Sequence, residues 1–157
     1  MADQEKFTST VEIAATPEKI WSMVSDLPRM GEWSPENVGG KWKGGATEPA
    51  PGVKFKGNNK NGWHRWSGGA VINEAQAPSR LSFIVKVGGL SGATWSYDIE
   101  PTPGGCKVTE SWLDTRNPLF KVGLVTKLAT GVADRTAYAQ ELMDTTLANI
   151  KKAAEVG

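Results

Sequence analysis

The chain has 157 residues and a mass of 16.9 kDa, a size at which folding removes roughly 68–70% of the unfolded chain's surface from water. Hydrophobic residues make up 39% and charged residues 22%, and 18 basic against 17 acidic side chains leave a formal charge of +1. This composition excludes disordered, collagen-like and polybasic classes. We expect residues 1–157 to form one domain with its own core.

Seven Trp beside one His and one Cys are the unusual feature of the composition. Cys106 has no second cysteine in the chain to pair with, and together with His64 it supplies too few ligands for a zinc site. We therefore expect no metal and no cofactor. Because no stretch resembles a signal peptide or a membrane span, we also expect a cytoplasmic protein without integral membrane association.

The N-terminal third predicts one strand followed by two short helices. Residues 7–13 alternate between apolar and polar side chains, which is typical of a half-buried strand. Thr16-Pro17 predicts a helix start, because a Thr side chain caps free amides and Pro at the first helical position loses no hydrogen bond. Residues 27–33 have room for one or two further turns.

From residue 38 to residue 115, short β-rich runs alternate with turn residues, the pattern of an antiparallel sheet. Asn61-Gly62 predicts a type I′ hairpin, since both residues tolerate positive φ. Gly68-Gly69 within a strand predicts a bulge or bend, and residues 88–92 predict a hairpin loop. The six expected strands lie near residues 41–43 and at 53–59, 63–72, 81–87, 93–100 and 107–115.

The C-terminal region changes to a helical period. Apolar residues recur on one face from Val132 to Ala154, so a helix over residues 131–155 is expected. At 1.5 Å per residue it would be about 37 Å long, enough to cross a sheet. Residues 116–130 are too apolar for a free linker, and both a short helix and a lid over the sheet fit them.

Together these elements predict an α+β domain in which a seven-stranded curved antiparallel sheet wraps around a long C-terminal helix. A curved sheet does not close flat on one helix, so the space between them is either filled with side chains or left as a ligand cavity. A binding role requires a cavity of at least ~300 Å³ there.

The element order, the segment Asp26-Leu27-Pro28-Arg29-Met30-Gly31-Glu32-Trp33-Ser34-Pro35 and the strand Gly105-Cys106-Lys107-Val108-Thr109-Glu110-Ser111-Trp112 resemble the START/Bet v 1-like (SRPBCC) superfamily. The most similar branch is that of polyketide cyclases, dehydrases and lipid transport proteins. The resemblance covers roughly residues 5–154 and implies a helix-grip fold around a hydrophobic cavity for lipids, sterols, polyketides or other aromatic molecules. Many members of the superfamily bind ligands without converting them.

Glu110 is the most informative polar residue. On a strand it shares a face with Val108 and Trp112, so it is expected to point inward among apolar neighbours with a raised pKa. Two alternatives stand beside this functional interpretation, pairing with an arginine and exposure to solvent.

His64 follows the predicted hairpin turn and has the parity of Trp66. It fits either the cavity rim, where it would relay a proton or bind a ligand carbonyl, or an exposed position at the turn. Basic and aromatic residues interleave in this region as they do on single-stranded nucleic-acid surfaces. Alternation along half-buried strands explains the pattern equally, and the balanced charge argues against nucleic-acid binding.

The leading hypothesis is binding, for transport or sequestration, of a small hydrophobic, lipid-like or aromatic ligand between the sheet and the last helix. The alternative is a polyketide cyclase or dehydratase in which Glu110 transfers protons together with His64 or Tyr97. The expected ligand-binding residues are Trp33, His64, Trp66, Phe83, Trp95, Tyr97, Glu110, Trp112, Met143 and Leu147.

Overall fold

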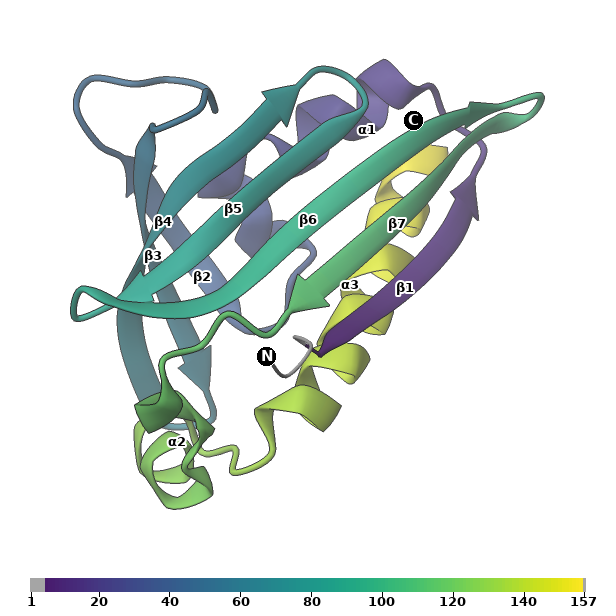
Figure 1. Cartoon of the computed structure of the whole chain (residues 1–157). Coiled ribbons are helices and arrows are strands. Elements are labelled where there is room, and N and C mark those ends of the chain that lie inside the picture. Colours follow the sequence, from purple (N-terminus) through teal and green to yellow (C-terminus); the bar gives the residue numbers. More distant parts are fainter. Residues whose placement is uncertain (1–4, 157) are drawn as a thin grey trace.

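A curved antiparallel sheet of seven strands forms one wall of the molecule, and the long C-terminal helix lies across its concave side (Figure 1). The computed structural model describes residues 5–156. The strand order is β1-β7-β6-β5-β4-β3-β2, which confirms the expected helix-grip architecture. The strands are β1 (Lys6–Ile13), β2 (Asn37–Trp42), β3 (Lys54–Asn61), β4 (His64–Gln76), β5 (Arg80–Val87), β6 (Leu90–Thr102) and β7 (Gly105–Leu113).

Two short helices connect β1 to β2, as the sequence predicts. The first is α1 (Pro17–Val24), which begins where Thr16 Oγ1 accepts a hydrogen bond from the backbone N–H of Lys19 at 3.2 Å. The second is the 3₁₀ helix η1 (Leu27–Glu32). After β7 come a 3₁₀ turn, η2 (Pro118–Lys121), and two helices, α2 (Gly123–Thr130) and α3 (Arg135–Val156). None of the helices within residues 5–156 is long and apolar enough to cross a membrane.

The start of the last helix differs from the prediction. Gly131 adopts φ +79° and ends α2, and its backbone N–H bonds to the carbonyl of Lys127. The chain re-enters a helix only at Arg135, where the Asp134 carboxylate accepts hydrogen bonds from the backbone amides of Thr136 and Ala137. The apolar period continues through this break, so periodicity alone does not reveal the break. The signals for it are Gly131, which ends α2, and Asp134, which caps α3.

Two hairpin turns differ from the prediction: the β3–β4 turn lies one residue later in the chain, and the β5–β6 loop is shorter. Asn61 pairs directly with His64, so Gly62 and Trp63 form the turn, and Gly62 takes the positive φ of +61°. This is the geometry of a type II′ turn, with glycine first, rather than a type I′ turn on Asn61-Gly62. The loop expected at 88–92 shrinks to Gly88-Gly89, both with positive φ, and the strands continue closer to the turn.

The Gly68-Gly69 pair is not a bulge. Gly57 faces Gly68 and Lys56 faces Gly69 in unbroken register, while the β4–β5 register shifts at Ile72/Glu74 instead.

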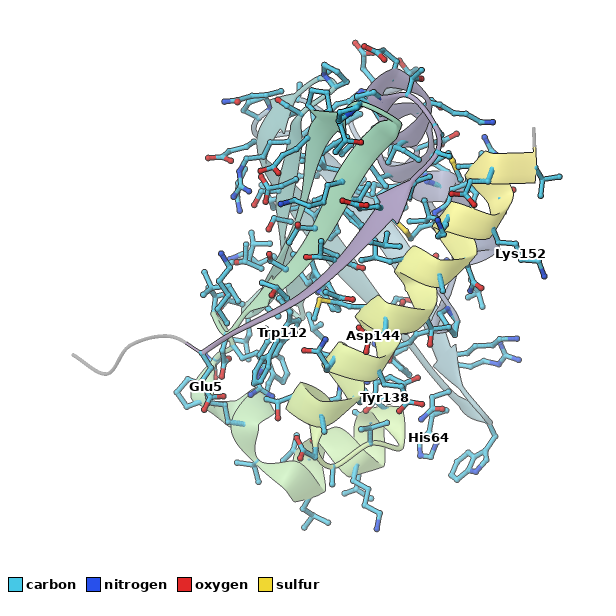
Figure 2. All side chains as sticks on the ribbon, turned by 90° about the vertical axis from the view of Figure 1, so that its right-hand side faces the viewer. Glu5, His64, Trp112, Tyr138, Asp144 and Lys152 are labelled. Carbon is cyan, nitrogen blue, oxygen red and sulfur yellow. The ribbon has the colours of Figure 1, made fainter. Side chains whose placement is uncertain are left out.

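The main core lies where α3 and α1 meet the concave face of the sheet. The buried face of α3 consists of Ala139, Leu142, Met143, Thr146, Leu147, Ile150 and Ala154. Leu147, Ile150 and Ala154 pack with buried residues of α1 and of the sheet, such as Ile20, Leu81 and Val108, each at most 1% exposed. Ala139 and Met143 form a second, smaller cluster with Ala93 and Trp112. Figure 2 shows α3 running beside β1 along this face. At the end of α3 near residue 135 the core gives way to a cavity.

Gly105 offers a test of the β1–β7 edge. A Cβ added there would lie 2.1 Å from the carbonyl oxygen of Ile13 and 2.9 Å from the backbone nitrogen of Ala15, so β1 must move. We expect Gly105→Ala to lower the free energy of unfolding by about 2 kcal/mol or more in urea denaturation. Gly104→Ala, with no neighbouring atom within 4 Å, is the control and should change it by less than about 0.5 kcal/mol. Equal effects of the two substitutions would contradict the edge packing.

Candidate functional site

A cavity of about 170 Å³ lies between the concave face of the sheet and the N-terminal half of α3. Its walls come from η1 and the residues after it, from β3 to β7, and from α3. Phe83, Trp66 and Trp95 supply flat aromatic surface, while Asn59 and Thr146 add uncharged polar groups. Such a mixture suits a small molecule with an apolar body and a few polar atoms.

Tyr97 and Glu110 form a buried pair in this cavity. They face each other across β6 and β7, and the Tyr97 hydroxyl donates to Glu110 Oε1 at 2.9 Å. Each residue is only 3% exposed, and no described residue makes a hydrogen bond to Glu110 Oε2. Neither alternative from the sequence, an arginine partner or a solvent-facing position, holds for Glu110 within residues 5–156.

Burial without a cation changes the chemistry of this acid. Burial raises the pKa of Glu110 to about 8, although the Tyr97 hydrogen bond opposes the rise, and the charge of Asp144 raises the pKa further. Burial and the neighbouring Glu110 also raise the pKa of Tyr97 well above its usual value. At neutral pH the Glu110 carboxyl is therefore mainly protonated, and with Oε1 accepting from Tyr97, Oε2 can donate a hydrogen bond to a bound molecule.

A second cavity of about 180 Å³ adjoins the first and lies under η2 and α2. Trp112 and Val87 line its sheet side, and Phe120 and Val125 line the opposite side. It is the more apolar of the two. Residues 116–130 thus fold into short helices that cover a cavity, and their movement as a lid stays a prediction.

Arg135 stands in the wall that the two cavities share, together with Trp66, Val85 and Trp95. Its guanidinium donates two hydrogen bonds to the Glu36 carboxylate, at 2.7 and 3.1 Å, and lies 5.7 Å from the ring centroid of Trp66. Glu36 is only 6% exposed and the Arg135 side chain 20%, so this is a bidentate ion pair between a buried carboxylate and a partly buried guanidinium. No local pattern indicates this pair, because the two residues are 99 positions apart and neither stands in a motif.

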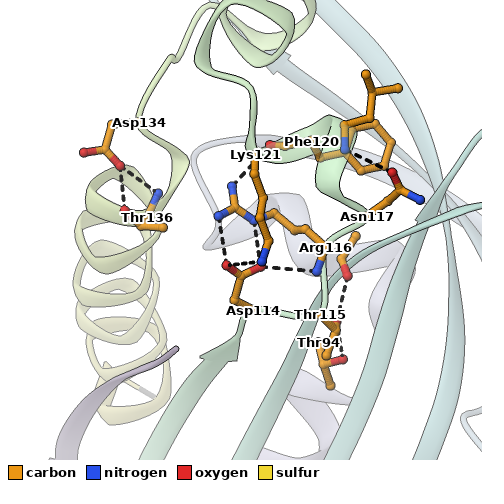
Figure 3. Close-up of polar contacts among 11 residues, drawn as sticks. Thr94, Asp114, Thr115, Arg116, Asn117, Phe120, Lys121, Asp134 and Thr136 are labelled. Carbon is orange, nitrogen blue, oxygen red and sulfur yellow. Dashed lines mark hydrogen bonds and ion pairs between the residues drawn. The ribbon is translucent and has the colours of Figure 1, made fainter. Parts of the chain in front are cut away.

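A second polar cluster anchors the segment that covers the second cavity (Figure 3). Arg116 donates to both carboxylate oxygens of Asp114, at 2.9 and 3.1 Å, and to the carbonyl of Phe120 at 3.3 Å. Lys121 Nζ lies 3.5 Å from the same carboxylate. Burial alone would raise the pKa of Asp114, but the hydrogen bonds and charges of Arg116 and Lys121 outweigh it and hold the pKa below its ordinary value.

The structure brings six of the ten predicted ligand-binding residues to these cavities. Trp66 and Trp95 line both, while Trp112 lines only the second. Those that line only the first are Phe83, Tyr97 and Glu110. Their role in binding stays a prediction.

The other four predicted residues line neither cavity. Trp33, Met143 and Leu147 are buried side chains, each at most 4% exposed. His64 lies at the end of the β3–β4 hairpin, where it stacks on Trp63 with ring centroids 4.1 Å apart. In Figure 2, His64 and Trp112 lie on opposite sides of α3. His64 lines neither cavity, whereas Glu110 lines the first, so the two side chains do not share a cavity.

A curved antiparallel sheet that wraps around a long C-terminal helix defines a helix-grip domain. The family model described as polyketide cyclase / dehydrase and lipid transport matches residues 4–155. The chain belongs to this family, and so to the START/Bet v 1-like superfamily. Family membership supports a ligand-binding or cyclase role.

Solved structures show the same fold. A polyketide-cyclase-like protein from Corynebacterium glutamicum superposes with a TM-score of 0.67 at 27% sequence identity, covering 99% of this chain and 94% of that one. The di-domain ARO/CYC StfQ from the steffimycin biosynthetic pathway gives 0.72 at 14% identity, covering 96% of this chain and 50% of its own. The Aha1 dimer from Colwellia psychrerythraea gives 0.68 at 15% identity, covering 98% of each. None of the curated proteins compared with the sequence matches it.

The raised pKa of Glu110 predicts a pH-dependent stability. In the folded state Glu110 keeps its proton up to about pH 8, whereas the unfolded chain loses it near the ordinary value of 4.5. Between these values the folded state binds more protons, so stability falls by up to about 1.4 kcal/mol per pH unit as pH rises.

Glu110→Gln removes this loss and keeps an acceptor for Tyr97. The variant should gain stability relative to the wild type as pH rises from 5 to 8, measured by urea denaturation at each pH. Glu12→Gln, at an exposed position on β1, serves as the control. A difference between Glu110→Gln and the wild type that does not change with pH would show that Glu110 has an ordinary pKa.

Proposed function

We propose that this chain binds a small, flat, largely apolar molecule, aromatic or lipid-like, between the sheet and α3, for transport or sequestration. The observation that carries the proposal is the neutral acid Glu110, which lines a buried cavity and has an oxygen with no partner among the described residues. A buried polar atom of this kind usually finds a partner, and a ligand carbonyl or hydroxyl would provide it.

The rings around Glu110 determine the shape of the ligand. Trp66, Trp95 and Phe83 line the cavity on neighbouring strands, and flat molecules pack on such rings in offset or edge-to-face arrangements. The polar end of the ligand would lie against Glu110 and Tyr97, and its apolar body would extend toward the second cavity. Selectivity for the ligand would then come from the hydrogen bond that the Glu110 carboxyl donates and from the spacing of the three aromatic rings.

The size of the interior limits the ligand. Each cavity, at about 170 and 180 Å³, falls short of the expected ~300 Å³ that is typical of pockets for drug-sized ligands. A small aromatic acid or phenol fits one cavity. A longer ligand would occupy both cavities and would then extend past Arg135 and Trp66, which line both of them.

A cyclase or dehydratase is the second candidate, and the pKa of Glu110 near 8 favours it. General acid–base catalysis works best when the pKa of the group lies near the working pH, and cyclisation needs only proton transfers in a shaped pocket. In such an enzyme Glu110 would transfer the proton, and the Tyr97 hydroxyl would hold the Glu110 carboxyl in position. His64 lies outside the cavity and would take no part. The name of StfQ, an ARO/CYC, is consistent with such chemistry.

Binding is tested by intrinsic Trp fluorescence against fatty acids, sterols and flat aromatic phenols or ketones. The background variant Trp63→Phe removes the 85% exposed indole, so that the remaining signal reports mainly on the interior. We expect a saturable change with at least one ligand class, and mass spectrometry of the purified protein should identify a co-purifying molecule of that class. No saturable change with any class would contradict the binding proposal.

The protonation state of Glu110 should control affinity for a ligand that accepts its hydrogen bond. With a pKa of about 8, raising the pH from 6.5 to 9.5 should weaken binding of a neutral aromatic ketone by up to roughly 30-fold. Glu110→Gln keeps a neutral donor, so its affinity should stay nearly constant over this range. An equal pH dependence in both proteins would place the controlling group elsewhere.

The cyclase candidate makes a different prediction for the same variant. Glu110→Gln should abolish turnover of a poly-β-ketone substrate, followed by chromatography of the products, yet leave its binding within about threefold, because the amide keeps the shape and loses the proton transfer. Unchanged turnover would remove Glu110 from the mechanism.

A further inference from the structure

The helix α2 is apolar on both of its faces. Val125 and, just before the helix, Phe120 line the second cavity, whereas Leu124 and Leu128 point outward and are 68% and 72% exposed. A helix at a protein surface normally keeps apolar residues on one face only. The outer face of α2 therefore lacks a covering partner within residues 5–156.

The exposed leucines belong to a larger apolar end of the molecule. The β3–β4 hairpin contacts the end of α2, where Asn61 Nδ2 donates to the carbonyl of Thr130 at 3.0 Å. Trp63 at the tip of this hairpin is 85% exposed. Figure 1 shows α2 beside this hairpin, away from the end of the molecule that carries the C-terminus. We define the apolar end as Trp63, Leu119, Val122, Leu124 and Leu128.

Positive charges surround the apolar end. Lys60 and Arg65 stand directly opposite each other on β3 and β4, just behind Trp63, and both are exposed. Like charges at facing positions destabilise a sheet, so folding alone gives no reason for this pair. Lys127 lies exposed on α2, and none of these three cations forms an ion pair with another residue in the described part of the chain.

Acidic residues near this segment are already engaged. No Asp or Glu occurs between Asp114 and Asp134. Asp114 is held by Arg116 and Lys121, and Asp134 accepts the hydrogen bonds that cap α3 (Figure 3). The apolar end thus combines exposed leucines, an exposed indole and uncompensated positive charge.

We propose that the apolar end docks on a membrane surface that contains anionic phospholipid. Leu124 and Leu128 would enter the boundary of the acyl chains, Trp63 would lie at the headgroup level where indoles concentrate, and the cations would meet lipid phosphates. Single-stranded nucleic acid fits less well, because successive bases need several exposed rings to stack on, and Trp63 is the only strongly exposed aromatic side chain within residues 5–156. Phe55, between Lys54 and Lys56 on β3, is only 5% exposed.

Docking in this orientation would place the second cavity next to the lipid. Residues of α2 and η2 line the side of this cavity that would face the membrane, so an apolar molecule would have a short path between lipid and protein. This route rests on the proposed ligand-binding function, whereas the docking itself does not.

The test is flotation of the ligand-free full chain with vesicles of phosphatidylcholine alone or with 30% phosphatidylglycerol. We expect binding to the anionic vesicles only, weakened by 0.5 M NaCl because the attraction is partly electrostatic. Leu124→Asp/Leu128→Asp should reduce the bound fraction by roughly tenfold or more, since it places charge where apolar surface must be buried. Trp63→Ser should reduce it independently of α2.

Val156→Asp, at an 83% exposed position near the other end, is the matched control and should bind like the wild type. Circular dichroism and thermal unfolding check that every variant is folded. No binding to anionic vesicles, or equal binding by the leucine variant, would overturn the proposal. Gel filtration without vesicles gives a further test. A wild-type dimer that becomes a monomer in the leucine variant would also overturn the proposal, because the apolar end would then join two copies of the chain. Ligand titrations without vesicles separate failure of docking from failure of ligand binding.

Discussion

The register between β6 and β7 places Glu110 opposite Tyr97 inside the sheet, and the chemistry of the interior depends on this pairing. A carboxylate without a cation is too costly to bury, so the group keeps its proton and becomes a neutral donor and acceptor. The phenol fixes one oxygen and leaves the other for a ligand. The curvature of the sheet then determines how much space surrounds that oxygen, and α3 covers the open side of this space.

The interior differs from a filled core in one respect. Apolar side chains of α1, α3 and the sheet pack closely around Ile20 and Leu147, yet near Arg135 two small cavities remain. Arg135, which is paired with the buried Glu36, stands in the wall that the two cavities share, and removing such a pair from water leaves little net stability. Because Arg135 lines both cavities, it is placed to determine whether a ligand in the first cavity extends into the second.

Strand periodicity accounts for most of what could be predicted from the sequence. Because side chains alternate at every residue of a strand, the inward direction of Glu110, Tyr97 and Trp112 could be worked out from their neighbours, and the number of strands from the turn residues. Local patterns do not encode long-range packing, so Glu36 with Arg135 and the core position of Trp33 were not foreseen. The helix start was misplaced because the apolar period continues past Gly131.

Titration of the Glu110 carboxyl itself shows whether the cavity holds a neutral acid. Carbon-13 NMR of protein labelled at glutamate side-chain carboxyls, with the resonance assigned by Glu110→Gln, follows its protonation as pH is raised. We expect a midpoint near 8, which agrees with a neutral acid in the cavity at physiological pH. A midpoint near the ordinary value of 4.5 would mean a buried carboxylate and would contradict the role of Glu110 as a neutral hydrogen-bond donor.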